Sequence, residues 1–187
     1  MSHPYRFPPS CRRAFAALLL AVILAGCNSR PSAPALEDGT VYNDRRQGFR
    51  FFVPEGWKQR ARGTVPSGKI VGERMLVEYK CLTPGTSAGL MVTVADVPES
   101  TSLSEYLAKN NLTREDWRLA APAEDFTING VPAARITYLQ GAGKDQSVRE
   151  IVAFRRGERV YFFKGFYASA DAKSRKAVKA TIETVVW

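Results

Sequence analysis

One segment near the C-terminus constrains the fold of this 187-residue chain more than any other. Between Arg159 and Tyr167, the run Val160-Tyr161-Phe162-Phe163 is apolar at four consecutive positions. Successive side chains of a strand point to opposite faces of the sheet, so this strand is apolar on both faces. Such a strand needs further layers above and below the sheet. We therefore expect a sheet with structure packed on each of its faces.

The residues after this strand predict the helix that covers one of these faces. Ser169 is a preferred N-cap residue, and from Ala170 to about Val185 apolar side chains fall on one stripe with basic residues opposite. The stripe consists of Ala177, Val178, Thr181, Ile182 and Val185. We expect this helix to dock across the strand 159–167 and Trp187 to pack at its end.

Turn signals divide the preceding chain into further strands. Asn129-Gly130 supplies the positive φ angles of a tight hairpin turn, and Arg156-Gly157-Glu158 provides a second turn. Alternating and apolar runs predict strands at 48–53, 70–82, 90–97, 126–128, 131–139, 148–155 and 159–167. Residues 58–69 match no regular pattern and are predicted to be irregular.

A helix is also predicted between the strands. Ser102 and Glu105 form a capping box at its start, and a second short helical turn is expected at 113–117. Since successive hairpins make a sheet largely antiparallel, the sequence predicts one α+β domain with helices packed on both faces of the sheet. The composition, with 45% hydrophobic and 24% charged residues, suits such a globular domain and excludes a collagen or a disulfide-dense mini-protein.

Several motifs in this domain resemble a known fold family. They are Gly48-Phe49-x-Phe51-x-Val53-Pro54-x-Gly56-Trp57, the hairpin Thr127-Ile128-Asn129-Gly130-Val131-Pro132, and a terminal helix followed by Trp187. Together they look like the PsbP-like α/β/α sandwich, a grouping that includes DcrB-type lipoproteins and the photosystem II extrinsic protein. The resemblance covers residues 41–187 and implies a binding or assembly module whose partner is not specified by the fold.

The N-terminus reads as a secretory signal peptide. Residues 1–13 contain three arginines and no acidic residue, and an uninterrupted apolar run follows from Ala14 to Gly26. This run of 13 residues is shorter than the roughly 20 that a membrane-spanning helix needs. We therefore expect residues 1–26 to be a cleaved leader.

The end of the leader resembles the lipobox of bacterial lipoproteins. Leu24, Ala25 and Gly26 would be recognised by the signal peptidase, and Cys27 would carry the acyl chains that bind membrane lipid. Residues 27–40, rich in Pro, Ser and Ala, would then tether the domain to the membrane. By the same resemblance, Asn28 in place of Asp favours the outer over the inner membrane. The expected location is the cell envelope, with the domain facing the periplasm.

Loss of the leader removes three arginines and no acid, which lowers the formal net charge from +9 to +6. An exported lipoprotein rarely meets nucleic acid, so we expect none as a partner. The basic residues are expected to form a solvated surface, with proximity to anionic headgroups as the functional alternative. The expected protein partner is an unidentified component of the envelope.

The residues available for catalysis are few. The single histidine, His3, lies in the leader, so a mature domain lacks Ser-His-Asp or Cys-His catalysis and histidine-ligated metal sites. Ser87 lies in a G-x-S-x-G match, but a strand rather than a helix follows it. We expect no enzyme activity; a hydrolase would have to pair Ser87 with a lysine base such as Lys69 or Lys80.

Other site patterns are incomplete, so no cofactor or metal site is expected. Residues 63–69 match the start of a P-loop, but Ile70 replaces the Ser or Thr that would hold Mg²⁺. Acidic pairs at 37–38, 115–116 and 124–125 lack the spacing of a calcium loop. A rival function is a lipid- or small-ligand-binding lipoprotein that uses a cleft between sheet and helix.

Cys81 is the one thiol expected to remain free after processing. It alternates with Val77 and Tyr79, which places it on the core face of its strand. We expect a buried, unreactive thiol, with an intermolecular disulfide as the alternative.

Overall fold

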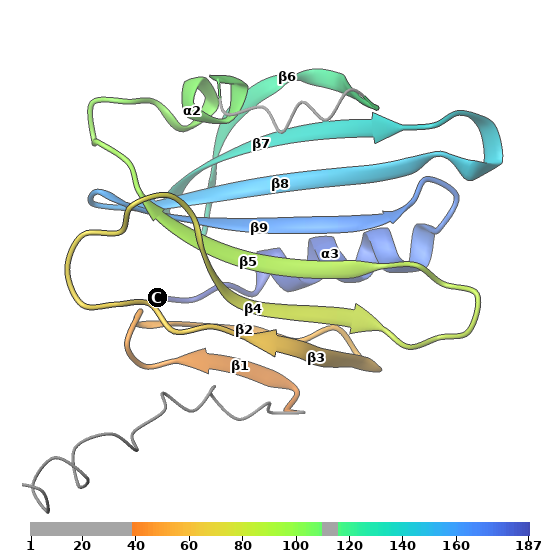
Figure 1. Ribbon diagram of the computed structural model, residues 1–187, viewed down its shortest axis with the longest axis horizontal. Helices are drawn as coiled ribbons and strands as arrows, with labels where there is room; N and C mark the ends of the chain where they lie inside the picture. The colour runs from red at the N-terminus through yellow and green to blue at the C-terminus, as the bar shows by residue number, and fades with distance from the viewer. Residues whose placement is uncertain (1–38, 110–115) are drawn as a thin grey trace, which may run out of the picture. The chain divides into compact units, whose positions relative to one another are not determined.

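An antiparallel sheet dominates the computed structural model, which describes residues 39–109 and 116–187. The strands are β1 (Val41–Asp44), β2 (Phe49–Phe52), β3 (Trp57–Arg62), β4 (Arg74–Cys81), β5 (Gly89–Asp96), β6 (Trp117–Ile128), β7 (Val131–Gln140), β8 (Ser147–Arg156) and β9 (Arg159–Ala168). The helices are α2 (Leu103–Lys109) and α3 (Ala172–Glu183), with a 3₁₀ turn at Gly143–Asp145. The large sheet has the order β3-β4-β5-β9-β8-β7-β6, and β1 and β2 pair separately (Figure 1).

All neighbouring strands of the large sheet are antiparallel, as predicted. Strands β3 to β5 form one run of successive hairpins, strands β6 to β9 form a second, and β5 pairs with β9 where the two runs meet. The predicted tight turns are confirmed: Asn129 and Gly130 have φ angles of 50° and 77° between β6 and β7, and Gly157 has a φ of 59° between β8 and β9.

Structure covers both faces of the sheet, so the layered α+β architecture is confirmed. Alternate residues of β9 enter two apolar clusters: Phe162 packs in a cluster with Leu103 and Leu107 of α2, and Phe163 packs in a cluster with Val178 of α3. We call these the α2-side and α3-side clusters. The β1–β2 hairpin joins α3 on its side of the sheet (Figure 1). Among the described residues, the buried members of both clusters lie between 42 and 185.

The C-terminal residues fasten α3 to the sheet as predicted. The Trp187 ring lies 4.8 Å from the ring of Tyr161 and 5.0 Å from that of Phe49, centroid to centroid. The guanidinium of Arg156 lies 5.0 Å from the centroid of the Trp187 ring. Offset and tilted aromatic contacts of this kind add to the stabilisation that burial gives.

The cap of α3 differs from the prediction. Asp171, not Ser169, accepts the hydrogen bond of the Ser174 amide, at 2.9 Å. Ser169 instead donates its own amide to the Gln146 carbonyl, at 2.7 Å, which extends the pairing beyond β9. The helix therefore begins at Ala172 and ends at Glu183, shorter at both ends than expected. In α2 the serine half of the predicted capping box is confirmed, since Ser102 Oγ accepts the Glu105 amide at 3.1 Å, whereas the Glu105 carboxylate accepts a hydrogen bond from Lys109 Nζ at 2.5 Å.

Other strands also differ from the prediction, and β1 is absent from the predicted strands altogether. Most of β3 lies in the segment 58–69 that was predicted to be irregular, and β4 begins at Arg74 rather than at residue 70. The inward positions of β3 include the polar Gln59, whose Nε2 donates to the Tyr79 hydroxyl at 3.2 Å, so hydrophobic alternation does not mark this strand. The helical turn predicted at 113–117 is wrong at Trp117, which opens β6; residues 113–115 lie outside the described ranges.

Strand β6 gave a weak sequence signal because it is an edge strand. Most of its side chains between Trp117 and Asp125 are exposed, and it contains Pro122, which edge strands tolerate. Its pairing with β7 is interrupted by register shifts on both sides of Ala121. A strand of this kind has no alternating apolar pattern to recognise.

Candidate functional site

The expected lipidation site and its recognition residues, Leu24, Ala25, Gly26 and Cys27, lie outside the described residues. The described chain begins at Gly39 and enters β1 two residues later. Neither described helix is long and apolar enough to cross a membrane.

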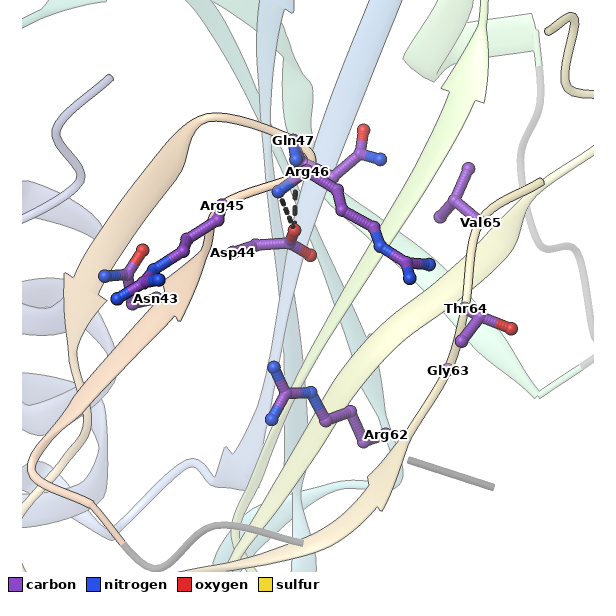
Figure 2. Close-up of a pocket in the computed structure, with 9 residues that line it drawn as sticks. All are labelled: Asn43, Asp44, Arg45, Arg46, Gln47, Arg62, Gly63, Thr64 and Val65. Atoms are coloured by element: carbon purple, nitrogen blue, oxygen red, sulfur yellow. Dashed lines mark hydrogen bonds between the residues drawn. The ribbon is translucent and has the colours of Figure 1, made fainter. Parts of the chain in front are cut away.

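A cleft of about 570 Å³ lies between the turn that joins β1 to β2 and the residues that follow β3 (Figure 2). It is lined by Asn43, Asp44, Arg45, Arg46, Gln47, Arg62, Gly63, Thr64 and Val65. We call this the arginine cleft. Figure 2 shows Arg46 extending from the turn toward the segment that carries Thr64, and Arg62 extending from the end of β3 toward the turn.

Asp44 shapes the turn that forms one wall of the arginine cleft. Its Oδ1 accepts the backbone amides of Arg46 and Gln47, each at 3.0 Å, which is the geometry of an Asx turn. Gly48 completes the turn with a φ of 72°, a conformation that glycine adopts without strain. The carboxylate thus sets the direction in which the side chain of Arg46 leaves the backbone.

Gln47 fixes the same turn to the centre of the sheet. Its Oε1 accepts hydrogen bonds from Arg159 Nη1 and from the Tyr161 hydroxyl, each at 3.2 Å. Arg159 in turn pairs with Asp96 across the β5–β9 ladder, with 3.2 Å between Nε and Oδ1. The wall of the cleft is therefore held by buried strands and is largely preformed.

The cleft carries an excess of positive charge. Three of its lining residues are arginines, and Asp44 is its one acidic lining residue. Both oxygens of that carboxylate already accept hydrogen bonds, since Oδ2 takes the Tyr42 hydroxyl at 3.0 Å. Burial, with a further contribution from the Asp44 carboxylate, raises the pKa of Tyr42, so the phenol stays neutral. Guanidinium groups so placed can bind a carboxylate or phosphate group from outside the domain.

The sequence alone does not show that these three arginines line the same cleft. Arg45 and Arg46 precede β2, whereas Arg62 ends β3, a strand that the sequence pattern does not predict. Their proximity depends on the β1–β2 hairpin folding over the end of β3, which local patterns do not encode.

A second groove, of about 500 Å³, lies beside the loop between β4 and β5. We call it the β4–β5 groove; its lining includes Lys80, Cys81, Ser87, Lys164 and Phe166. Cys81 packs against the α3-side cluster but is only half-buried, so the prediction of a buried thiol is wrong. The reason is that Cys81 ends β4 and lies at the margin of the core.

The geometry gives little support to the alternative of a hydrolase with a serine–lysine pair. Ser87 lies in the loop between two strands, not in the strand-to-helix turn of a nucleophile elbow. Lys80 shares the groove, but its Nζ lies 3.9 Å from Glu78 Oε1. Lys69 precedes Ile70, whose amide donates to Asp96 at the far end of β5, so about 23 Å of strand separates that region from Ser87.

The P-loop match has a structural explanation. Residues 63–73 lead from β3 into β4, where a nucleotide-binding loop would lead into a helix. A Cβ atom on Gly63 would lie 2.0 Å from the Met75 carbonyl oxygen, so glycine is required there for the close approach of two backbones.

The acidic pair at 124–125 also has structural partners. Asp125 Oδ2 accepts a hydrogen bond from the Ser104 hydroxyl at 2.6 Å, at the start of α2. Glu124 Oε1 lies 3.4 Å from Arg135 Nη1. Residues 37, 38 and 115 of the other pairs lie outside the described ranges. Within the described ranges, no group of three or more His, Cys, Asp or Glu side chains could hold a metal ion.

No protein-family model matches the chain, and no curated protein matches it in sequence. Solved structures do match its fold. The solution structure of cyanobacterial PsbP (CyanoP) from Synechocystis sp. PCC 6803 has a TM-score of 0.52 and 16% identity, and the match covers 88% of this chain and 98% of that one.

A crystal structure from Bacteroides thetaiotaomicron VPI-5482 has a TM-score of 0.51 and 11% identity; the match covers 80% of this chain and 48% of that one, so this chain spans about half of its length. A protein of unknown function from Pseudomonas aeruginosa has a TM-score of 0.49 and 14% identity, with 82% and 98% coverage. At these identities the likeness concerns the fold alone. The described domain has a PsbP-like α+β fold, as the resemblance of its motifs implies.

Proposed function

We propose that this protein is a lipid-anchored lipoprotein of the bacterial cell envelope whose domain acts as a non-catalytic binding or assembly module. The observation that carries the anchoring is the sequence Leu24-Ala25-Gly26-Cys27 at the end of a basic and then apolar leader. A processed Cys27 would carry several acyl chains, and two or more chains suffice for stable membrane attachment. Asn28 favours the outer membrane, with the domain in the periplasm.

The anchoring is tested on the full chain, expressed with its leader in a bacterium. Mass spectrometry of the mature N-terminus should show an acylated Cys27, and membrane fractions should contain the protein. Cys27→Ala should leave an unprocessed or soluble protein, whereas Cys81→Ala, which removes the other thiol of the processed chain, should not alter acylation. A wild-type protein that retains Met1, or carries an unmodified Cys27, would contradict the proposal.

The arginine cleft supports the binding role. Its preformed wall, its three arginines and its single, already hydrogen-bonded carboxylate favour a partner that offers carboxylate or phosphate groups. We propose an envelope protein with an acidic segment as that partner.

Cross-linking in intact cells tests this role. Arg46→Glu should abolish the cross-linked product. Lys176→Glu, an equal change of charge at an exposed position on α3, should preserve it. Identical products from the two variants would exclude the arginine cleft as the binding site.

The β4–β5 groove favours a second candidate function, the carriage of a small amphiphile. Its lining combines apolar side chains such as Met91 and Phe166 with the cationic Lys80 and Lys164. Native mass spectrometry of the purified protein should then detect a bound lipid, and Met91→Trp, which fills the groove, should remove it. Protein without bound lipid, after extraction in mild detergent, would count against this candidate.

A further inference from the structure

An apolar patch occupies the outward face of the β1–β2 hairpin. Val41, Phe52 and Val186 are 41%, 59% and 47% exposed. Val41 and Phe52 oppose each other across the hairpin, and Val186 forms a bridge with Arg50 on the other side of β2. Since opposed residues share a face, these three apolar side chains point the same way, together with Arg50. We call the three the hairpin patch.

The inner face of the hairpin is fully used. Tyr42, Phe49 and Phe51 are at most 3% exposed and belong to the α3-side cluster. The inner face of the hairpin is therefore apolar and covered, whereas the outer face carries the hairpin patch beside Arg50 and is uncovered in the described chain. Apolar residues that are exposed singly are ordinary, but contiguous ones around a groove mark an interaction site.

The hairpin patch surrounds a groove of about 290 Å³. Its lining is completed by Arg50, Phe51 and Thr184, so its charge is positive and no acidic side chain lines it. Arg45 lines the adjoining pocket together with Arg50 and Val186. Apolar side chains bordered by arginines match the boundary between acyl chains and anionic headgroups of a bilayer.

The point at which the chain enters the domain also favours a lipid bilayer as the partner of the hairpin patch. The Thr40 carbonyl accepts the Val53 amide at 2.8 Å, which holds Thr40 beside the Val41–Phe52 pair. Cys27 precedes Thr40 by thirteen residues, which span at most about 45 Å. A lipid anchor at Cys27 would therefore keep the hairpin patch close to the membrane surface at a high effective concentration.

We propose that the hairpin patch is a membrane-docking surface, with Val41, Phe52 and Val186 seated at the headgroup boundary and Arg50 and Arg45 facing phosphate groups of anionic phospholipids. The proposal rests on the lipid anchoring proposed above. In addition to this anchor, the β1–β2 hairpin would contact the bilayer directly and hold the domain against the membrane surface.

The test attaches the domain to vesicles by chemistry, independently of acylation in cells. A chain that begins at Cys27, with Cys81→Ser, is coupled through Cys27 to a maleimide lipid in phosphatidylglycerol–phosphatidylcholine vesicles that contain brominated acyl chains. The reporter is Phe52→Trp, and the matched control is Leu119→Trp, at a position that is 47% exposed on the edge strand β6. Emission is compared with that of the protein without the added tryptophan.

We expect the bromolipids to quench about half of the emission added at position 52, because a docked side chain reaches the outer acyl region, and little of that added at position 119. Arg50→Glu should reduce the quenching at position 52, whereas Lys176→Glu on α3 should not. Thermal unfolding of each variant confirms that the domain is folded. Equal quenching at both positions, or none at position 52, would overturn the proposal.

Two other outcomes are informative. If position 52 is unquenched in vesicles but its emission shifts when solubilised envelope protein is added, a protein covers the hairpin patch and membrane docking is wrong. If quenching occurs as expected but Cys27 is unmodified in cells, the anchoring proposal fails while the affinity of the patch for bilayers stands.

Discussion

Gly165 of β9 lies directly beneath Val178 of α3: a Cβ atom on residue 165 would lie 2.6 Å from Val178 Cγ1. The helix therefore packs on bare backbone at this point, and Val178 is completely buried there. Gly165 does not have a positive φ angle, so its backbone conformation would suit other residues. Glycine is required here because the helix approaches the strand so closely.

Gly165→Ala should accordingly lower the free energy of unfolding by about 1–3 kcal/mol, the usual cost of overpacking a core. The measurement is urea denaturation of both proteins. In a double-mutant cycle, Val178→Ala should cost less in the Gly165→Ala background than in the wild type, since it removes the clashing methyl groups. Strictly additive effects would mean that the two residues do not meet.

Ile182→Ala tests the docking of α3 as a whole. Ile182 is 3% exposed within the α3-side cluster, and truncation of such a residue costs about 2–5 kcal/mol. The melting temperature should fall by roughly 5 °C or more. Lys179→Ala is the control, because Lys179 is exposed and its pairing with Glu183, at 3.9 Å, is weak. An unchanged melting temperature in Ile182→Ala would show that α3 does not contribute to the core.

Asp171 should make stability depend on pH at acid values. Hydrogen bonds from the side chain and the backbone amide of Ser174 hold the pKa of this carboxyl below its usual value of 3.8. A lowered pKa in the folded state stabilises the fold at every pH above 3.8, and this contribution disappears as the pH falls through the lowered value.

Since Asp171 lies at the surface, we expect Asp171→Ala to cost about 0.5–1 kcal/mol at pH 7, the usual loss for a helix cap. Urea denaturation of wild type and variant should give converging stabilities below pH 3.8. Glu55→Ala, in an exposed turn, should cost little at either pH. A difference at pH 7 that persisted unchanged in acid would show that the charged cap is not its source.

Tyr42 should make the stability of the fold depend on pH at alkaline values. Burial, aided by the Asp44 carboxylate, raises its pKa above the usual 10.0. Above pH 10.0 the unfolded chain therefore releases a proton that the folded domain retains, and stability declines as the pH rises. Tyr42→Phe should lose less stability than the wild type between pH 8 and pH 11, although at pH 8 it lacks the hydrogen bond to Asp44. Urea denaturation measures this, and equal declines would contradict it.

The strands that the sequence predicts correctly are those whose environment is uniform along their length. Val160-Tyr161-Phe162-Phe163 is buried on both faces, and the turns at Asn129-Gly130 and Gly157 require glycine-like backbone angles, so local residues suffice to identify them. The strands that were missed in whole or in part differ: β1 has only four residues, β3 places Gln59 in the core, and β6 is exposed along most of the stretch from Trp117 to Asp125. Strands β3 and β6 are defined by their pairing with β4 and β7, not by an apolar pattern of their own.

The two proposed binding surfaces also depend on tertiary structure. The arginine cleft needs the β1–β2 turn, with Arg46, to lie opposite the end of β3, with Arg62, and the hairpin patch needs Val186 to reach β2 from the other end of the chain. Each is a product of tertiary structure, and neither has a motif. By contrast, the proposed leader and lipidation site at Cys27 can be proposed from local sequence, because processing enzymes would read a linear segment.

The pairing of β5 with β9 divides the sheet along a seam. Each side of the seam is built from consecutive strands that pair with their neighbours in the chain, whereas the seam itself joins segments far apart in the chain, from the Gly89–Phe166 pair to the Asp96–Arg159 pair. Closing a long loop costs more entropy than forming a hairpin, so the two sides should assemble first and the seam last. A chain cut between α2 and β6 would leave each side whole, and we expect such fragments to recombine into one domain when mixed.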